Sequence, residues 1–122
     1  MSKVMFRAAE RKDAGRILEF IRALADYEKM ADQVVATEEL LTEWLFDKQA
    51  ARVIFALEGD QEVGFALYFH NFSTFLGRCG IYLEDLFVRP EHRGKGYGRA
   101  LFGALARIAQ QHGCPRFEWS CL

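Results

Sequence analysis

The stretch Arg93-Gly94-Lys95-Gly96-Tyr97-Gly98 contains the residues best suited to bind an anion in this chain. Glycines at alternate positions leave backbone N–H groups uncovered by side chains, so a phosphate group can approach closely. The stretch follows the apolar run 81–88 and opens a periodic segment that reaches about His112. It therefore lies between a predicted strand and a predicted helix, whose free N–H groups and positive dipole end point at the same place. The sequence predicts a site here for a ligand that carries phosphate.

Two better-known phosphate-binding loops do not match this stretch. The dinucleotide fingerprint requires G-x-G-x-x-G near the start of a βαβ unit, whereas the glycines here run G-x-G-x-G late in the chain. A Walker loop requires G-x-x-x-x-G-K-[S/T], which the sequence lacks. The remaining alternative to a phosphate site is a glycine-rich turn that only caps the helix.

Length, composition and charge exclude several classes of protein. The chain has 122 residues, of which 51% are hydrophobic, and this predicts one domain with a packed core. A formal net charge of −1 gives no basic footprint for nucleic acid. The sequence has neither a run of roughly 18 apolar residues for a membrane span nor the apolar region of a signal peptide. We therefore expect no nucleic acid and no membrane among its partners.

The cysteines and histidines favour neither a disulfide framework nor a metal site. Cys79, Cys114 and Cys121 are odd in number and scattered, and we interpret them as reduced thiols of a cytoplasmic protein. The three histidines lack metal-ligand spacing with each other and with the cysteines. We expect no metal cofactor.

The periodicity of the whole chain predicts elements in the order β-α-α-β-β-β-α-β. Strands are predicted at 4–8, 52–58, 62–70, 81–88 and 117–122, and helices at 12–30, from 37 to about 46, and from 97 to about 112. Thr37 is the predicted N-cap of the second helix, and Gly113 the predicted residue after the end of the third. Residues 71–80 are interpreted as a loop. This order indicates an α/β fold with a mixed sheet.

A series of short motifs spans nearly the whole chain in a fixed order. The motifs are Tyr27-Glu28-Lys29-Met30, Gln33-Val34, Thr37-Glu38-Glu39-Leu40-Leu41, Val63-Gly64-Phe65-Ala66 and Tyr82-Leu83-Glu84-Asp85-Leu86-Phe87-Val88, followed by the Arg-x-x-Gly-x-Gly spacing. With these motifs the chain resembles the GNAT N-acetyltransferases and, among them, the branch of spermidine/spermine and thialysine acetyltransferases. The Tyr-Leu-Glu-Asp-x-x-Val strand joined to Arg-Gly-x-Gly-x-Gly is the specific part of the resemblance.

The resemblance implies a mixed, mostly antiparallel sheet with flanking helices, and direct transfer of the acetyl group of acetyl-CoA to the primary amine of a small molecule. It implies that the β-strand backbone binds the pantetheine arm and that the glycine loop binds the pyrophosphate. The cofactor-binding residues would be Leu86, Phe87, Val88, Arg93, Gly94, Lys95, Gly96, Tyr97, Gly98 and Arg99. Glu84 would draw a proton from the amine, and Tyr27, Glu28 and Asp85 would bind the acceptor.

The residues alone leave alternatives for two parts of this site. Alternation along a strand puts Glu84 and Asp85 on opposite faces, so both reach one pocket only if a bulge or bend interrupts the strand. Otherwise they are ordinary acids at the end of a sheet, paired with Arg89 or Arg93. Arg93 could bind phosphate or pair with Glu91.

Tyr27 also has an alternative interpretation, since it could pack in the core at the end of its helix. In polyamine-specific relatives the loop before the Glu-Asp strand carries an acid and a Trp, whereas Ser73 and Phe75 stand at the corresponding places. This difference favours a lysine-like or thialysine-like amine over spermine, although the sequence does not name the amine.

The family pattern also includes one more helix and two more strands, with a Tyr that serves as general acid, and the given sequence ends before them. We therefore expect one N-acetyltransferase domain over residues 1–122 with weak turnover, and the alternative is a CoA-binding module or an enzyme fragment. We also expect a homodimer, because an open edge and apolar face near Phe117 and Trp119 would favour pairing with another chain.

Overall fold

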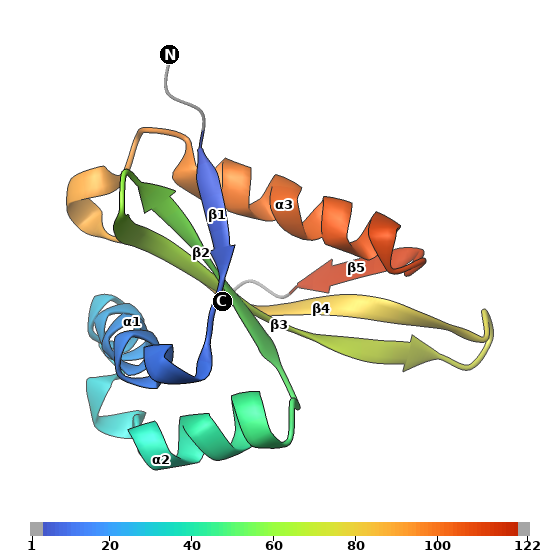
Figure 1. Ribbon diagram of the computed structural model, residues 1–122, viewed down its shortest axis with the longest axis horizontal. Helices are drawn as coiled ribbons and strands as arrows, with labels where there is room; N and C mark the ends of the chain where they lie inside the picture. The colour runs from blue at the N-terminus through green and yellow to red at the C-terminus, as the bar shows by residue number, and fades with distance from the viewer. Residues whose placement is uncertain (1–3, 120–122) are drawn as a thin grey trace.

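Five strands form a single sheet in the order β1-β2-β3-β4-β5 in the computed structural model, which describes residues 4–119 (Figure 1). The strands are β1 (Met5–Ala8), β2 (Arg52–Glu58), β3 (Gln61–Ser73), β4 (Arg78–Val88) and β5 (Arg116–Trp119). Strands β1 to β4 pair with their neighbours in antiparallel fashion, and β5 pairs with β4 in parallel. The predicted element order and the mixed, mostly antiparallel sheet are confirmed.

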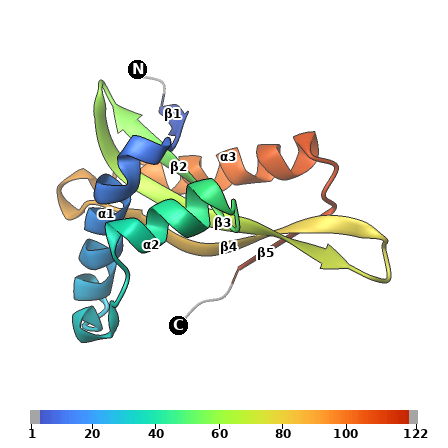
Figure 2. The same ribbon diagram turned by 60° about the horizontal axis from the view of Figure 1, so that its bottom comes forward.

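Helices cover both faces of this sheet. They are α1 (Ala14–Tyr27), α2 (Glu38–Leu41), which continues as a π-helical segment (Thr42–Asp47), and α3 (Tyr97–Gln111). Figure 2 shows α1 and α2 together in front of the sheet and α3 behind it. Thr37 caps α2 as predicted, because its Oγ1 accepts a 3.1 Å hydrogen bond from the N–H of Leu40. Within residues 4–119, no helix is long and apolar enough to cross a membrane.

Two apolar clusters cover the sheet, one on each of its faces. Strand alternation sends Val53 and Phe55 of β2 toward α1, and Ile54 and Ala56 toward α3. On the α1 side, Phe20 of the helix stacks with sheet aromatics, and its ring is fully buried. The sheet is therefore buried on both faces, and its strands carry nearly continuous apolar runs.

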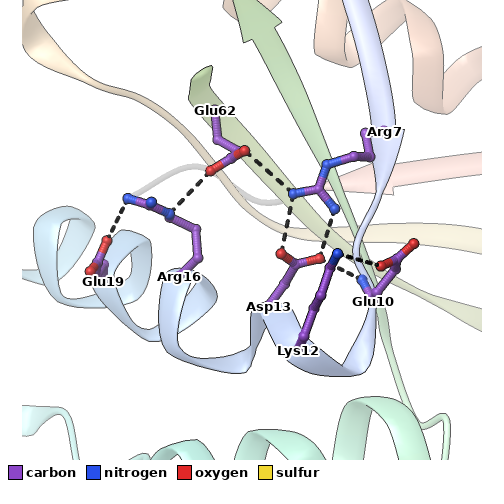
Figure 3. A network of polar contacts seen from close by, with 7 residues as sticks. All are labelled: Arg7, Glu10, Lys12, Asp13, Arg16, Glu19 and Glu62. Carbon is purple, nitrogen blue, oxygen red and sulfur yellow. Dashed lines mark hydrogen bonds and ion pairs between the residues drawn. The ribbon is translucent and has the colours of Figure 1, made fainter. Parts of the chain in front are cut away.

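An ion-pair network fixes the start of α1 to the sheet (Figure 3). Nη1 of Arg7 donates to Oδ2 of Asp13 at 2.7 Å, and Nη2 of Arg7 lies 3.4 Å from Glu62. Asp13 also accepts a 2.7 Å hydrogen bond from the N–H of Glu10, and Nε of Arg16 lies 3.1 Å from Glu62. The hydrogen bonds from Arg7 lower the pKa of Asp13 below its ordinary value, although burial acts in the opposite direction. The network joins β1, β3 and α1 at one point.

The β3–β4 hairpin is longer than predicted. The interpretation of residues 71–80 as a loop was wrong, because β3 continues to Ser73 and β4 begins at Arg78. Only residues 74–77 form the turn, and Gly77 there has a φ of 67°, which glycine adopts without steric cost. Backbone pairing holds this end of the hairpin, while Phe72 is 64% exposed. Such a segment lacks the buried apolar face by which strands are recognised in a sequence.

The prediction of three reduced thiols was also wrong, because Cys79 and Cys114 form a disulfide with their Cα atoms 4.9 Å apart. Cys79 lies near the start of β4, and Cys114 lies just before β5. The two strands are parallel neighbours, and Gly80 pairs with Arg116, so their starts meet although α3 separates them in the sequence. Cys121 lies outside the described residues.

Candidate active site

A cleft of about 750 Å³ opens where the end of α1 meets the end of β4 and the start of α3. Its walls are Leu24, Tyr27, Glu28, Leu86, Phe87, Val88, His92, Arg93, Gly94, Gly96, Tyr97, Gly98 and Arg99. Every predicted cofactor-binding residue except Lys95 is in this set, together with two predicted acceptor-side residues. The structure thus brings three separate parts of the chain into one cavity.

The glycine loop leaves open space in front of the first turn of α3. Gly94 and Gly96 have φ angles of 80° and 86°, in the left-handed region that glycine tolerates best. A Cβ atom added at either position would meet nothing within 4 Å. The N–H groups of the first turn of α3 lack intrahelical partners and carry the positive end of the helix dipole. These features fit a pyrophosphate group.

A carboxylate from β2 holds the first turn of α3. The hydroxyl of Tyr97 donates a 2.7 Å hydrogen bond to Oε2 of Glu58, and Nδ1 of His92 lies 3.1 Å from the same oxygen. Lys95 reaches Glu58 at 3.5 Å, which explains why it does not line the cleft. The hydrogen bond from Tyr97 is the main cause of the lowered pKa of Glu58. Glu58 thus anchors the loop from outside the cleft.

The end of β4 presents backbone groups to the cleft. The N–H of Arg89 donates to the carbonyl of Val63 on β3 at 2.9 Å, so alternation directs the N–H and C=O groups of Val88 and Leu86 away from β3. Nε of Arg93 donates to the carbonyl of Val88 at 3.1 Å, which agrees with this direction. The described pairing of β4 with β5 ends at Leu83, so the described part of β5 does not pair with the backbone groups of Leu86 and Val88.

The side chain of Arg93 lies across the cleft. Its guanidinium carbon is 4.2 Å from the ring centroid of Tyr27 and 5.1 Å from that of Phe87. Among the described residues it forms no ion pair with Glu91, which was one of the two alternatives. Tyr27 is 64% exposed and lines the cleft, so the alternative that it packs in the core is wrong.

A β-bulge in β4 places the two acids. Leu83 pairs with Tyr68 and Asp85 pairs with Leu67, so Glu84 has no partner on β3. Leu83 and Leu86 both pack in the cluster on the α3 side, so the two residues between them lie on the α1 side. The bulge required for both acids to reach one place is therefore confirmed. Within residues 4–119, neither acid pairs with Arg89 or Arg93.

Three carboxylates gather on this side of β4. Burial raises the pKa of Asp85 to about 6, and the charges of Glu84 and Glu28 add to the shift. Glu84 and Asp85 do not line the cleft but directly precede Leu86, which does. This group can neutralise a cationic amine and accept its proton.

Sequence reasoning missed three residues of this site. Leu24 and His92 line the cleft, and Glu58 anchors it from β2. Leu24 precedes Tyr27 by three residues on α1, so helical periodicity could have found it. Glu58 carries no local signal, because its partners lie more than 30 residues further along the chain. None of the described residues form a group of three or more His, Cys, Asp or Glu placed to hold a metal ion.

The model of the acetyltransferase (GNAT) family matches residues 8–122. The chain belongs to this family. It is 39% identical to a thialysine N-epsilon-acetyltransferase from Sus scrofa over 131 aligned positions, which cover the whole of this chain and 76% of that protein. It is 32% identical to the human spermidine/spermine N(1)-acetyltransferase-like protein 1, over 96% of this chain and 18% of that protein. These relatives identify the chain as an acetyl-CoA-dependent N-acetyltransferase that acts on an amine.

Solved structures support the fold independently. An aminoglycoside acetyltransferase, meta-AAC0020, from an uncultured soil sample superposes with a TM-score of 0.84 at 18% identity. The match covers 98% of this chain and 78% of that one. At this identity the match shows the fold alone.

Proposed function

We propose that the enzyme acetylates a lysine-like or thialysine-like amine by direct transfer from acetyl-CoA. The observation that carries this proposal is the single cleft in which the glycine loop, the end of β4 and the acceptor-side end of α1 meet. A direct transfer requires both substrates at one place, and holding them there supplies the proximity that an uncatalysed bimolecular reaction lacks.

The cofactor half of the cleft would bind acetyl-CoA through backbone groups. The N–H groups from Gly94 to Arg99 would hold the pyrophosphate, and the outward backbone groups of Leu86 and the outward N–H of Val88 would pair with the pantetheine arm. Phe87, predicted to contribute backbone as well, contributes its ring to the cleft while its own N–H and C=O point toward β3 by alternation. When bound, acetyl-CoA supplies the activated acetyl group.

The acceptor half would prepare the amine. A primary ammonium has a pKa of about 10.4 and is not nucleophilic at neutral pH, so it must lose a proton before attack. We assign proton removal to Glu84, directly or through water, and the binding of the cationic acceptor to Asp85, Glu28 and Tyr27. The bulge supports this assignment because it turns both acids to the side of α1.

The preference for a short amine is supported by the relatives rather than by a contact. Thialysine acetyltransferases of pig and mouse are 39% and 35% identical to the whole chain. Ser73 and Phe75 replace the acid and Trp of polyamine-specific relatives, but Ser73 ends β3 and Phe75 lies in the turn after it, at the far end of the hairpin from α1 (Figure 1). Within one chain, therefore, this turn does not contact an acceptor bound near Tyr27.

Thiol release from acetyl-CoA with a panel of amines tests the proposal. We expect thialysine and lysine to have higher kcat/KM values than spermidine and spermine, with mass spectrometry showing one acetyl group on the side-chain amine. Ornithine serves as the shorter homologue. A ranking with spermine well above every short amine would overturn the substrate assignment, and no thiol release with any amine would overturn the enzyme assignment.

We also propose a homodimer that buries the region around β5. Strand β5 is an edge of the described sheet, and Trp119 there is 51% exposed beside Phe102 and Phe117. Light scattering should give twice the chain mass of 14.0 kDa, and Trp119→Glu should shift the protein toward the monomer. A wild-type monomer at micromolar concentration would contradict this part.

The proposed location is the cytoplasm. The Cys79–Cys114 disulfide argues for the opposite, because such bonds persist mainly in oxidising compartments. Alkylation of free thiols in intact cells decides the matter: modification of both cysteines indicates a reducing compartment, and protection of both indicates an oxidising one.

A further inference from the structure

Arg93 has a side chain that the family resemblance assigns to the cofactor phosphates, yet the structure directs it elsewhere. Its Nε is occupied by the carbonyl of Val88, and its guanidinium lies over Tyr27 on the opposite wall of the cleft. The ring of Tyr27 also makes an edge contact with Phe87, with the ring centroids 6.2 Å apart. Arg93 therefore joins the end of β4 to the end of α1.

We infer that Arg93 is a positioning residue for the acceptor half of the cleft, which it aligns by holding the ring of Tyr27, rather than a ligand of the pyrophosphate. This inference rests on the proposed function for the identity of the two halves.

Tyr27 needs such a partner because its own surroundings do not fix it. It is the last residue of α1, it is 64% exposed, and Lys29 two residues later adopts a φ of 59°, which turns the chain away from the helix. The guanidinium of Arg93 lies over the face of its ring, and Phe87 makes an edge contact with it. Phe87 is buried in the sheet and therefore holds one side of the Tyr27 ring rigidly, whereas the longer side chain of Arg93 can adjust its position over the ring.

The contact between Arg93 and Tyr27 also ties the acceptor half of the cleft to β4. A guanidinium stacked on an aromatic ring keeps its charge and offers its remaining N–H groups at the edge of the stack. Arg93 donates a hydrogen bond to the carbonyl of Val88, which points to the cleft. Its side chain is therefore attached to the strand along which the pantetheine arm would run. Arg93 thereby couples the position of the acceptor to the strand that carries the thioester.

The test compares acetyl-CoA with S-acetylpantetheine, which lacks the pyrophosphate. In Arg93→Gln, kcat/KM for the amine should fall roughly two- to fivefold with either acetyl donor, the range of an exposed cation–π contact. The ratio of kcat/KM for the two donors should stay within a factor of about two of the wild-type ratio. Arg99 also lines the cleft, and Arg99→Gln shows how the ratio responds when an arginine side chain near the pyrophosphate is lost.

A double-mutant cycle tests the contact itself. Tyr27→Leu removes the ring and should lower the kcat/KM for the amine as much as Arg93→Gln does. The two changes combined should cost little more than either alone, because both remove the same contact. Fully additive losses would overturn the inference.

Equilibrium binding of CoA gives a readout that does not need turnover. Calorimetry with CoA should give a dissociation constant within about twofold of wild type for both Arg93→Gln and Arg93→Lys. The second variant guards against a folding defect in the first. A loss of tenfold or more in CoA affinity in both variants would overturn the inference in favour of a phosphate ligand. Failure of the proposed function would appear differently, as absence of amine acetylation in the wild type.

Discussion

The hydroxyl of Tyr97 donates a 2.7 Å hydrogen bond to Glu58, and this bond joins the first residue of α3 to the last residue of β2. The bond raises the pKa of Tyr97 and lowers that of Glu58, so both groups keep their bonded protonation states at neutral pH. Because Tyr97 directly follows Gly96, the contact sets the direction in which the first N–H groups of α3 point.

Tyr97→Phe should therefore weaken CoA binding while leaving the fold intact. The ring would stay in its buried position, and only the hydroxyl that orients the loop would be lost. We expect a dissociation constant for CoA that is about two- to fivefold higher, because the lost hydrogen bond involves a partly exposed carboxylate. Calorimetry checks this, and Tyr82→Phe on β4 is a matched control. Equal weakening in the control would contradict the role of Glu58.

Gly96→Val should block the approach of the pyrophosphate. The substituted residue would fill the open space before α3 and would also strain a backbone with φ of 86°. Gly113→Val is the matched control, because Gly113 has a φ of 71° and equally open surroundings but lies at the other end of α3. Both variants should lose about 1–2 kcal/mol of stability. Only Gly96→Val should lose CoA binding in calorimetry, and unchanged affinity there would rule out this loop as the site.

Local signals predicted the parts of the fold that a short segment determines. The bounds of β2 agree with the predicted strand, and Thr37 and Gly113 have the predicted roles at helix ends. The glycine loop was equally accessible, because the spacing of Gly94 and Gly96 before a helix has a local steric meaning.

The position of the bulge, the disulfide and the role of Glu58 all depend on pairing between distant segments. The position of the bulge follows from the register in which Glu84 is skipped between β3 and β4. The disulfide follows from the parallel pairing of β4 and β5, which places Cys79 beside Cys114 across α3. Glu58 reaches the loop because β2 ends next to it. No periodicity in one segment encodes the neighbour that it will have in the sheet.

Glu84→Gln should lower kcat by roughly 10²- to 10⁴-fold, which is the usual effect of losing a general base. CoA affinity should change little, because Glu84 lies outside the cofactor half of the cleft. Stopped-time thiol release and calorimetry measure the two effects on the same preparation. An unchanged dependence of kcat on pH in the variant would count against Glu84 as the base.

Asp13→Asn should lower the stability of the free protein at pH 7 by about 1–3 kcal/mol, because it weakens a charged hydrogen bond that is largely buried. The pKa of Asp13 is lower in the folded state, so its stabilising effect is complete above its ordinary pKa of 3.8 and declines as pH falls below it. The difference between variant and wild type should therefore shrink in acid. Asp47→Asn, which removes an exposed pair with Arg11, should cost little at any pH. Equal losses in urea unfolding would contradict the prediction.

Asp85→Asn should have the opposite effect on stability, as expected of a carboxylate kept for function rather than for stability. The pKa of Asp85 is about 6 in the folded state against 3.8 ordinarily, so folding favours its protonated form. Its contribution is most favourable below pH 3.8 and is lost as pH rises through about 6, after which the charged group costs at most about 3 kcal/mol. The variant should therefore be about 1–3 kcal/mol more stable than wild type at pH 7 and no more stable below pH 4.

The exposed Asp26 of α1 provides the control for this prediction, since Asp26→Asn should not change stability in either range of pH. Urea unfolding at pH 3.5, 5, 6 and 7.5 would trace the difference directly. The stabilised Asp85→Asn variant should bind the amine more weakly, because the acceptor loses a countercharge beside Glu28 and Glu84. A variant that is less stable than wild type at pH 7.5 would show that Asp85 is held by contacts that favour its charge, and the cluster would then be structural.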